Sequence, residues 1–361
     1  MEISMRKISI FIICAFILAA GYFTITKYPK INKSNESNDK LVPIKSGNLS
    51  TDYSIDTALS DIDKFNLNTV NVPIAINIDD LSSNSMVIDE YSLAKAIDLI
   101  KILKKKEVNI ILEPYPWIDN GSMYETDWDP SNIDEFFWNW KTVVLKPLID
   151  EVAKPYDVDI LNIGTGFDHM EYAHGYWLDL IDYVRKHYDG LITYRTSWWI
   201  TASWDQDTFS DYQDKLNNPL FGELDFISIA AYFELTNNDT NSVNNLVKAL
   251  NKSQIFERDQ NIKKETKNFH IRWGKPIFFG ELGFPRTTKA SIHPWNPYAS
   301  TTINSTEQAN CFEAYRRVFE KEPWFMGFSI FAIGEDGDDK LYYPSNESTK
   351  IIRKWYNKSD I

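Results

Sequence analysis

The feature that most constrains the fold is a regular alternation of short apolar segments with helical segments, which runs from about residue 49 onward. Seven segments are rich in β-branched and aromatic residues and have the length of buried strands: 70–76, 109–113, 159–164, 191–194, 226–231, 276–280 and 326–331. Helical spacing of apolar residues occupies the intervals between them, at 57–65, 91–105, 132–152, 176–187, 244–251 and 307–321. Continuous apolar strands that alternate with helices indicate a parallel sheet covered on both faces. With an eighth strand near 47–50, the pattern predicts an α/β protein with a (β/α)8 TIM barrel, and a doubly wound open sheet is the alternative.

The first 46 residues have a different character. Arg6 and Lys7 precede an uncharged, apolar stretch at 8–26, which is nearly long enough to cross a hydrocarbon layer of about 30 Å. We expect residues 1–26 to be a transmembrane signal-anchor with its basic flank in the cytoplasm, or else a cleaved signal peptide. Residues 27–46 are polar and lack periodicity, which is typical of a flexible linker. The barrel, at 47–361, is therefore predicted to be extracytoplasmic and membrane-anchored, or secreted if the segment is cleaved.

Charge and motif content exclude several classes of protein. Lys and Arg number 38 against 51 Asp and Glu, a formal net charge of −13, so a nucleic-acid partner is not expected. The two cysteines lie far apart, and the five histidines have no metal-ligand spacing. No phosphate-binding loop, serine-hydrolase elbow or dinucleotide fingerprint is present. We therefore expect no cofactor and no metal, and nothing in the sequence indicates an oligomeric state. An acidic loop at 335–339 has oxygen ligands for calcium, but a solvated turn explains it better.

Carboxylates gather where the predicted strands end, which is where a (β/α)8 barrel carries its catalytic groups. Glu113, Asp168, Glu234 and Glu281 all follow a strand at its carboxyl end or within a few residues of it. Glycoside hydrolysis needs two such carboxylates, one to attack or stabilise the anomeric centre and one to protonate the leaving oxygen. The rim of the barrel is therefore predicted to hold a glycosidase-type site.

Aromatic residues make up 14% of the chain, and flat rings stack well on sugars. The candidates for substrate binding lie at or near strand ends: Trp117, Trp198, Trp199, Trp204, Tyr232 and Trp295. Some of them are expected to fill the core between the barrel and its helices instead. Trp138 and Trp140 lie within a helical pattern and are expected to pack.

Four segments resemble a known family. The run KPIFFGELGF at 275–284 resembles the seventh-strand nucleophile motif of the retaining β-mannanase and cellulase barrels in clan A of the glycoside hydrolases. The run DFISIAAYF at 225–233 resembles their sixth strand, and segments near 163–190 and 193–198 are similar to the fourth and fifth strands of a mannanase-like family. The resemblance implies that Glu281 is the nucleophile and that Tyr232 orients it.

The fourth-strand segment departs from this family. Where the family has its acid/base glutamate, this chain has Gly166, which cannot donate a proton. Either another carboxylate has taken over, or the barrel binds a glycan without cleaving it, or the site is inactivated. The catalytic candidates are Glu113 and Glu171, and Asp168 and Glu234 are further rim carboxylates that we expect to contact substrate.

The predicted function is an exported, endo-acting β-1,4-glycanase that hydrolyses a neutral cellulose- or mannan-like polysaccharide by a retaining double displacement. A neutral substrate is favoured because an acidic rim repels acidic glycans. The alternative is a glycan-binding barrel that retains or guides an exported polysaccharide. A hydrolase of cell-wall glycan is a third, weaker hypothesis.

Overall fold

The computed structural model describes residues 43–50, 52–334 and 338–357. Within these residues one sheet has the strand order β1-β9-β8-β7-β6-β5-β4-β2-β3, and β1 also pairs with β2, so the sheet closes on itself. All neighbouring barrel strands are parallel. The eight barrel strands are β1 (Ile44–Leu49), β2 (Thr69–Ile78), β4 (Asn109–Ile118), β5 (Ile160–Thr165), β6 (Leu191–Thr196), β7 (Ile227–Ala230), β8 (Ile277–Leu282) and β9 (Phe325–Ile333). The predicted (β/α)8 barrel is confirmed, and β3 (Val87–Ile88) adds antiparallel to β2.

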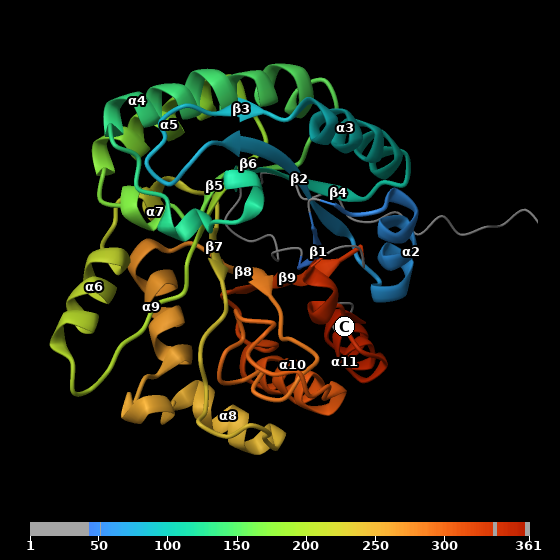
Figure 1. Ribbon diagram of the computed structural model, residues 1–361, viewed down its shortest axis with the longest axis vertical. Helices are drawn as coiled ribbons and strands as arrows, with labels where there is room; N and C mark the ends of the chain where they lie inside the picture. Colours follow the sequence, from blue (N-terminus) through green and yellow to red (C-terminus); the bar gives the residue numbers. More distant parts are fainter. Residues whose placement is uncertain (1–42, 51, 335–337, 358–361) are drawn as a thin grey trace, which may run out of the picture.

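Helices surround the barrel, as Figure 1 shows in a view toward the ends of the strands. They are α2 (Ile55–Phe65), α3 (Glu90–Lys105), α4 (Ile133–Asn139), α5 (His174–His187), α6 (Gln206–Leu216), α7 (Leu220–Glu223), α8 (Val243–Asn251), α9 (Ile262–Trp273), α10 (Ser305–Phe319) and α11 (Asn346–Asn357). Helix α3 illustrates why they form. The Asp89 side chain accepts a hydrogen bond from the backbone N–H of Ser92 and caps the first turn. Ala96, Leu99 and Leu103 then follow at helical spacing and are buried against the sheet.

The long helix predicted at 132–152 stays helical through Pro147, whose backbone lies in the α region, but it does not keep regular α-helical geometry. Helix α4 continues into two wider, π-type segments, Trp140–Leu145 and Leu148–Ala153, on either side of the proline. A proline lacks the backbone N–H that an α-helical hydrogen bond needs, so the helix widens there. Trp140 is buried, as predicted. The prediction that Trp138 packs is wrong, because its side chain lies on the outer side of the helix and is 62% exposed.

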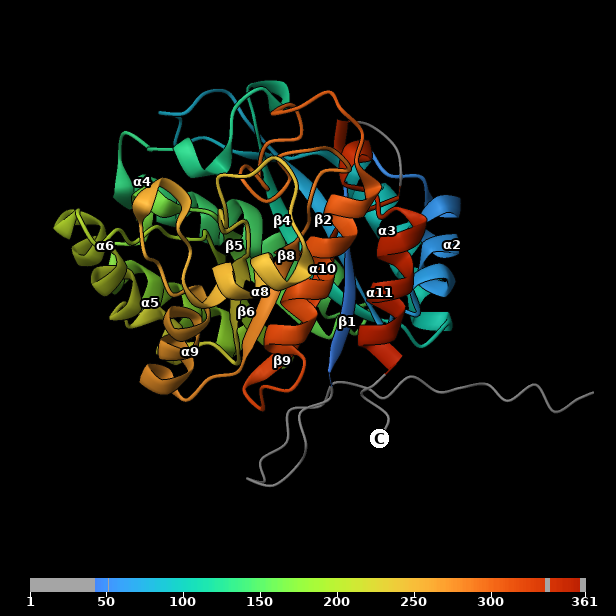
Figure 2. The ribbon, with the colours of Figure 1, turned by 90° about the horizontal axis from the view of Figure 1, so that it is seen from below.

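The interior of the barrel changes from apolar to charged along its axis. Near the strand starts, seven buried side chains form an apolar cluster: Ile44, Ile111, Ile160, Leu191, Phe226, Phe278 and Met326. Farther along the strands, Ser46 Oγ donates to Asn71 Oδ1 at 3.2 Å, and Asn71 Nδ2 donates to Glu113 Oε2 at 3.3 Å. The apolar end therefore closes the barrel, and the polar end leads to the strand ends. Figure 2 shows the long loops after the strands gathered at that end.

The two sides of the barrel's closing seam are joined by the last helix. The hydroxyl of Tyr356, on α11, donates to the carbonyl oxygens of Ser46 on β1 and Phe328 on β9, at 3.1 and 2.9 Å. The barrel begins at Ile44, three residues before the predicted start and inside the predicted linker. In the described ranges no helix is both long and apolar enough to cross a membrane. The predicted anchor at 1–26 and most of the linker lie outside the described residues, as do residues 335–337 of the acidic loop.

Candidate active site

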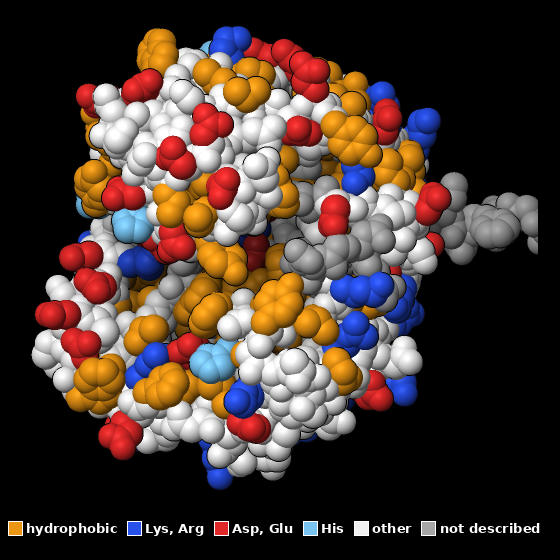
Figure 3. All heavy atoms as spheres, viewed as in Figure 1, with side chains coloured by type: hydrophobic (Ala, Val, Ile, Leu, Met, Phe, Trp, Pro, Cys, Tyr) orange, Lys and Arg blue, Asp and Glu red, His pale blue; other side chains and the backbone are white. Residues whose placement is uncertain are grey.

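The mouth of the barrel, at the carboxyl ends of the strands, is hollowed. Figure 3 shows this hollow lined largely by hydrophobic side chains, with charged side chains in its depth. Three strands place charged groups at its floor: β4 carries Glu113, β6 carries Arg195 and β8 carries Glu281. Parallel strands bring their carboxyl ends to one face of a barrel, which is why residues more than 160 positions apart meet here.

Arg195 links two carboxylates at this floor. Its Nη1 donates to Glu113 Oε2 at 2.7 Å, its Nη2 also donates to Glu113 Oε1, and the same Nη2 lies 2.7 Å from Glu281 Oε1. The arginine side chain is 2% exposed. Burial alone would lower its pKa, but the charges of Glu113 and Glu281 outweigh burial and raise the pKa. A permanently charged guanidinium thus holds two acids at fixed positions.

Glu281 is the member of this group that remains accessible, with 13% of its side chain exposed against 5% for Glu113. Burial raises the pKa of Glu281, and the charge of Arg195 and a hydrogen bond from the hydroxyl of Tyr232 oppose this rise. Both of these groups stabilise the anion. Tyr232 is itself held by an edge-on contact with the ring of Trp198, with centroids 5.5 Å apart. The geometry therefore presents Glu281 as an oriented carboxylate.

Gly166 lies directly after β5 and has a left-handed backbone, with φ at +61°. A Cβ at this position would lie 3.0 Å from Cγ of Glu125, 3.4 Å from Oε1 of Glu125 and 3.2 Å from Cγ2 of Thr126. These contacts are tighter than most that a Cβ makes, so a side chain at residue 166 would require Glu125 to move by a few tenths of an ångström. The space beside Gly166 is therefore already filled, and Glu125 is one of the residues that fills it.

Glu125 begins a short 3₁₀ turn, Glu125–Asp127, in the loop that follows β4. Burial raises the pKa of Glu125 to about 7, and the negative charge of Glu281 adds to the rise. Arg195 acts in the opposite direction. Glu125 was not predicted from the sequence, because it lies in an irregular loop and not beside a predicted strand end. The signal that could have found it is a glutamate in the loop between β4 and α4, since every such loop also reaches the mouth.

The other predicted catalytic candidate, Glu171, lies in a separate cluster. Its Oε1 accepts from the hydroxyls of Tyr194 at 3.0 Å and Thr196 at 2.7 Å, and its Oε2 lies 2.7 Å from Lys215 Nζ. Asp168 also contacts Lys215, at 3.5 Å, and burial raises the pKa of Asp168 while Lys215 opposes the rise. Within the described residues, the structure does not bring Glu171 into contact with Glu281.

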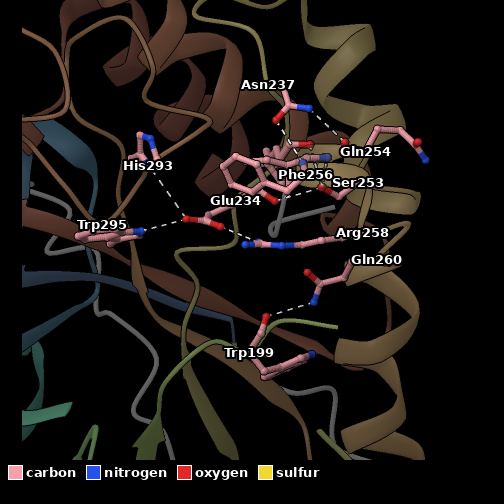
Figure 4. Close-up of polar contacts among 12 residues, drawn as sticks. Trp199, Glu234, Asn237, Ser253, Gln254, Phe256, Arg258, Gln260, His293 and Trp295 are labelled. Atoms are coloured by element: carbon pink, nitrogen blue, oxygen red, sulfur yellow. Dashed lines mark hydrogen bonds and ion pairs between the residues drawn. The ribbon is translucent and has the colours of Figure 1, made fainter. Parts of the chain in front are cut away.

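Glu234 lies at the rim, two residues beyond Tyr232 (Figure 4). Its Oε2 is 2.6 Å from Nη1 of Arg258, and its Oε1 accepts from the indole N–H of Trp295 at 3.3 Å. His293 Nδ1 approaches the same Oε1 at 3.9 Å. The carboxylate thereby orients the ring of Trp295, which is 41% exposed and available to stack on a ligand.

The remaining predicted tryptophans divide between surface and core. Trp117 and Trp198 are partly exposed, and Trp204 is 64% exposed. Trp199 is buried, and its indole N–H donates to Glu265 Oε2 at 2.9 Å. The prediction that Trp199 contacts substrate is therefore corrected: it packs against Tyr212 and Phe269 in the wall of the molecule.

Solved structures of other proteins share the fold of this chain. The β-mannanase AaManA of Glycoside Hydrolase Family 113 from Alicyclobacillus acidocaldarius, in complex with ManMIm, has a TM-score of 0.66 at 16% identity, over 89% of this chain and 99% of its own. A family 5 mannosidase from Rhizomucor miehei has a TM-score of 0.54 at 11% identity, over 93% of this chain and 98% of its own. A β-glucuronidase from Ruminococcus gnavus has a TM-score of 0.56 at 12% identity, over 88% of this chain and 51% of its own. At these identities the likeness is one of fold.

The family follows from the sequence rather than from these structures. A comparison with curated protein sequences finds no match. The sequence model of Glycoside Hydrolase Family 113 matches residues 44–350, which include every barrel strand, Gly166 and Glu281. This match confirms both the resemblance to β-mannanase-like barrels and the prediction of a glycoside hydrolase. The chain belongs to Glycoside Hydrolase Family 113.

Proposed function

We propose that this protein hydrolyses β-1,4-linked mannan-type chains, cutting within the chain and retaining the configuration at the anomeric carbon. The observation that carries the proposal is the placement of Glu281 at the mouth, accessible, ionically held by Arg195 and hydrogen-bonded by Tyr232. A nucleophilic carboxylate needs such partners because they stabilise its charge before it attacks. Among the compared proteins, the family 113 structure from Alicyclobacillus acidocaldarius is described as a β-mannanase, which favours mannan over cellulose.

The hollow mouth supports a polymeric substrate. Trp198 lies against Tyr232, whose hydroxyl hydrogen-bonds Glu281, and the exposed ring of Trp295 lies against Glu234. Rings at more than one place suit successive sugars of one chain. The apolar segment at 8–26 supports export, with the barrel acting outside the cytoplasm.

The test is hydrolysis by the full-length protein of β-1,4-mannan and β-1,4-glucan, with Glu281→Gln as the matched control. We expect reducing ends to accumulate on mannan faster than on glucan, oligosaccharides of intermediate length early in the reaction, and loss of roughly three orders of magnitude or more in the control. Proton NMR of the first product should show the β-anomer. An equal release of reducing ends by wild type and Glu281→Gln would refute the proposal.

A glycan-binding barrel is the second candidate, and the glycine at position 166 is what favours it. It predicts that oligosaccharides bind wild type and Glu281→Gln with similar affinity while neither turns over. Calorimetric titration with manno-oligosaccharides, carried out beside the hydrolysis assay, separates the two functions.

A further inference from the structure

A glycosidase of the retaining type needs a proton donor opposite its nucleophile, and the residue at the family's position for that donor is Gly166. In the structure, Glu125 occupies the space that a side chain at residue 166 would fill. Glu125 Oε1 lies 3.4 Å from the position where a Cβ on Gly166 would stand, and Glu125 Cγ lies 3.0 Å from it. The loop after β4 thus places a carboxyl group in the region that a side chain at residue 166, directly after β5, would enter.

The two catalytic candidates named from the sequence are already engaged. Both oxygens of Glu113 accept hydrogen bonds from Arg195. Both oxygens of Glu171 are likewise taken, by two hydroxyls and by the ammonium of Lys215. Neither carboxylate therefore has an oxygen without a partner, which leaves neither of them free to approach a leaving group. Within the described part of the chain, Glu125 forms no ion pair, so it differs from both.

The electrostatic surroundings of Glu125 also suit an acid. Burial raises its pKa to about 7, and the charge of Glu281 contributes in the same direction. A general acid works best when its pKa is close to the working pH, because it must carry a proton and also release it. The two carboxyl groups thus lie close enough for the charge of one to affect the other.

We propose that Glu125 is the general acid and base of this enzyme, supplied by the loop after β4 to replace the residue that Gly166 lacks. The inference rests on the proposed function. In the first step Glu281 attacks the anomeric carbon, the bond to the leaving oxygen breaks, and Glu125 donates its proton to that oxygen. In the second step Glu125, now a carboxylate, takes a proton from water as the water oxygen attacks the anomeric carbon. The bond between the anomeric carbon and Glu281 breaks as the bond to the water oxygen forms, and one water is consumed for each linkage cut.

The test compares wild type with Glu125→Ala on two substrates. On β-1,4-mannan we expect kcat/KM to fall by about 10²–10⁴-fold, because the sugar leaving group needs protonation. On a 2,4-dinitrophenyl β-mannobioside, whose leaving group needs no proton, formation of the glycosyl-enzyme should change little. Hydrolysis of the trapped intermediate should then be slow, and azide should restore turnover and yield the β-mannosyl azide.

Two controls make the result specific. Asp127→Asn removes an exposed carboxylate from the same 3₁₀ turn and should retain wild-type activity on both substrates. Labelling by a 2-deoxy-2-fluoro dinitrophenyl mannoside, followed by mass spectrometry, should modify Glu281 in wild type and in Glu125→Ala. If Glu125 had only a structural role, Glu125→Ala would lower the activity on both substrates equally. It would also prevent the labelling of Glu281, and azide would not restore turnover.

The possible failures are distinguishable. If wild type cleaves mannan and Glu125→Ala cleaves it equally well, the role of Glu125 is refuted while the proposed function stands. A wild type that is inactive on both substrates refutes both the proposed function and the role of Glu125.

The double variant Glu125→Ala/Gly166→Glu adds a further test, since removing the Glu125 side chain clears the space that a side chain at residue 166 needs. We expect it to recover part of the activity on mannan, and no more than partly, because residue 166 has a positive φ.

Discussion

At the scale of single residues, Arg195 organises the floor of the mouth. It is the shared partner of Glu113 and Glu281, and its own burial is compensated by their charge. Without it, two carboxylates would face each other in a poorly solvated space. Removing one partner of a buried ionic group usually costs more stability than the group contributes, because the remaining charges are left uncompensated.

Replacement of Arg195 by methionine is therefore expected to destabilise the protein by about 3–5 kcal/mol. Urea unfolding followed by fluorescence of the many tryptophans measures this change. Lys186→Met is the matched control, because it removes a cation from an exposed pair with Asp182 and should cost about 0–1 kcal/mol. Similar losses for the two variants would contradict the role given to Arg195.

At the scale of elements, the loop between β4 and α4 is what the site depends on. Its first part turns at Gly121, where φ is +80° and where a Cβ would lie 2.5 Å from the indole ring of Trp117. Any side chain at this position would displace either the ring or the turn. The 3₁₀ turn that carries Glu125 begins four residues later, so the same displacement reaches the site.

Gly121→Ala is accordingly expected to lower kcat on mannan by at least about tenfold, since small displacements of catalytic groups are costly. Circular dichroism should show an intact barrel, with a loss of stability of about 1–3 kcal/mol from overpacking. Gly175→Ala is the control, because nothing lies within 4 Å of its Cβ position and it lies in the first turn of α5. That variant should keep full activity, and an equally active Gly121→Ala would contradict the prediction.

The strands were easier to predict from the sequence than the helices and loops. All seven predicted strands are found, because buried parallel strands are nearly continuous apolar runs. Most ends shift by only one or two residues, but β4 extends five residues beyond its predicted end, to Ile118. Helices α6, α9 and α11 were not predicted. Helix α6 buries only Tyr212 and Leu216, so its helical period is weak in the sequence. Glu281 was found because a strand delivers it, whereas Glu125 comes from an irregular loop whose path the sequence pattern does not define.

At the scale of the whole molecule, the acids of the mouth lower stability at neutral pH. The pKa of Glu125 rises from its ordinary value of 4.5 to about 7 in the folded protein. The folded state therefore binds this proton more tightly than the unfolded chain does. The contribution of Glu125 to the free energy of unfolding is fully present below about pH 4.5 and is lost as the pH rises through about 7. This contribution is at most about 3 kcal/mol. Glu313 acts at a different pH, since Arg316 and Arg317 outweigh burial and lower its pKa to about 2.

Glu125→Gln should therefore be more stable than wild type at about pH 8 and nearly equal to it at about pH 4. Thermal or urea unfolding at several pH values measures the difference. Contributions from Glu313 and other acids are common to both proteins and cancel in the comparison. A difference that is independent of pH would show that residue 125 does not titrate in this range. The activity of the wild type should fall over the same pH range, above about pH 7, because the donor loses its proton there.

The closing seam of the barrel has a consequence for how the protein is made. Strand β1 pairs with β9, and Tyr356 joins both of them from α11. While the ribosome is still translating the middle of the message, β1 has no partner on that side and offers an open edge to other nascent chains. Chaperones that shield this first strand until translation is almost complete should therefore decide the yield of soluble enzyme.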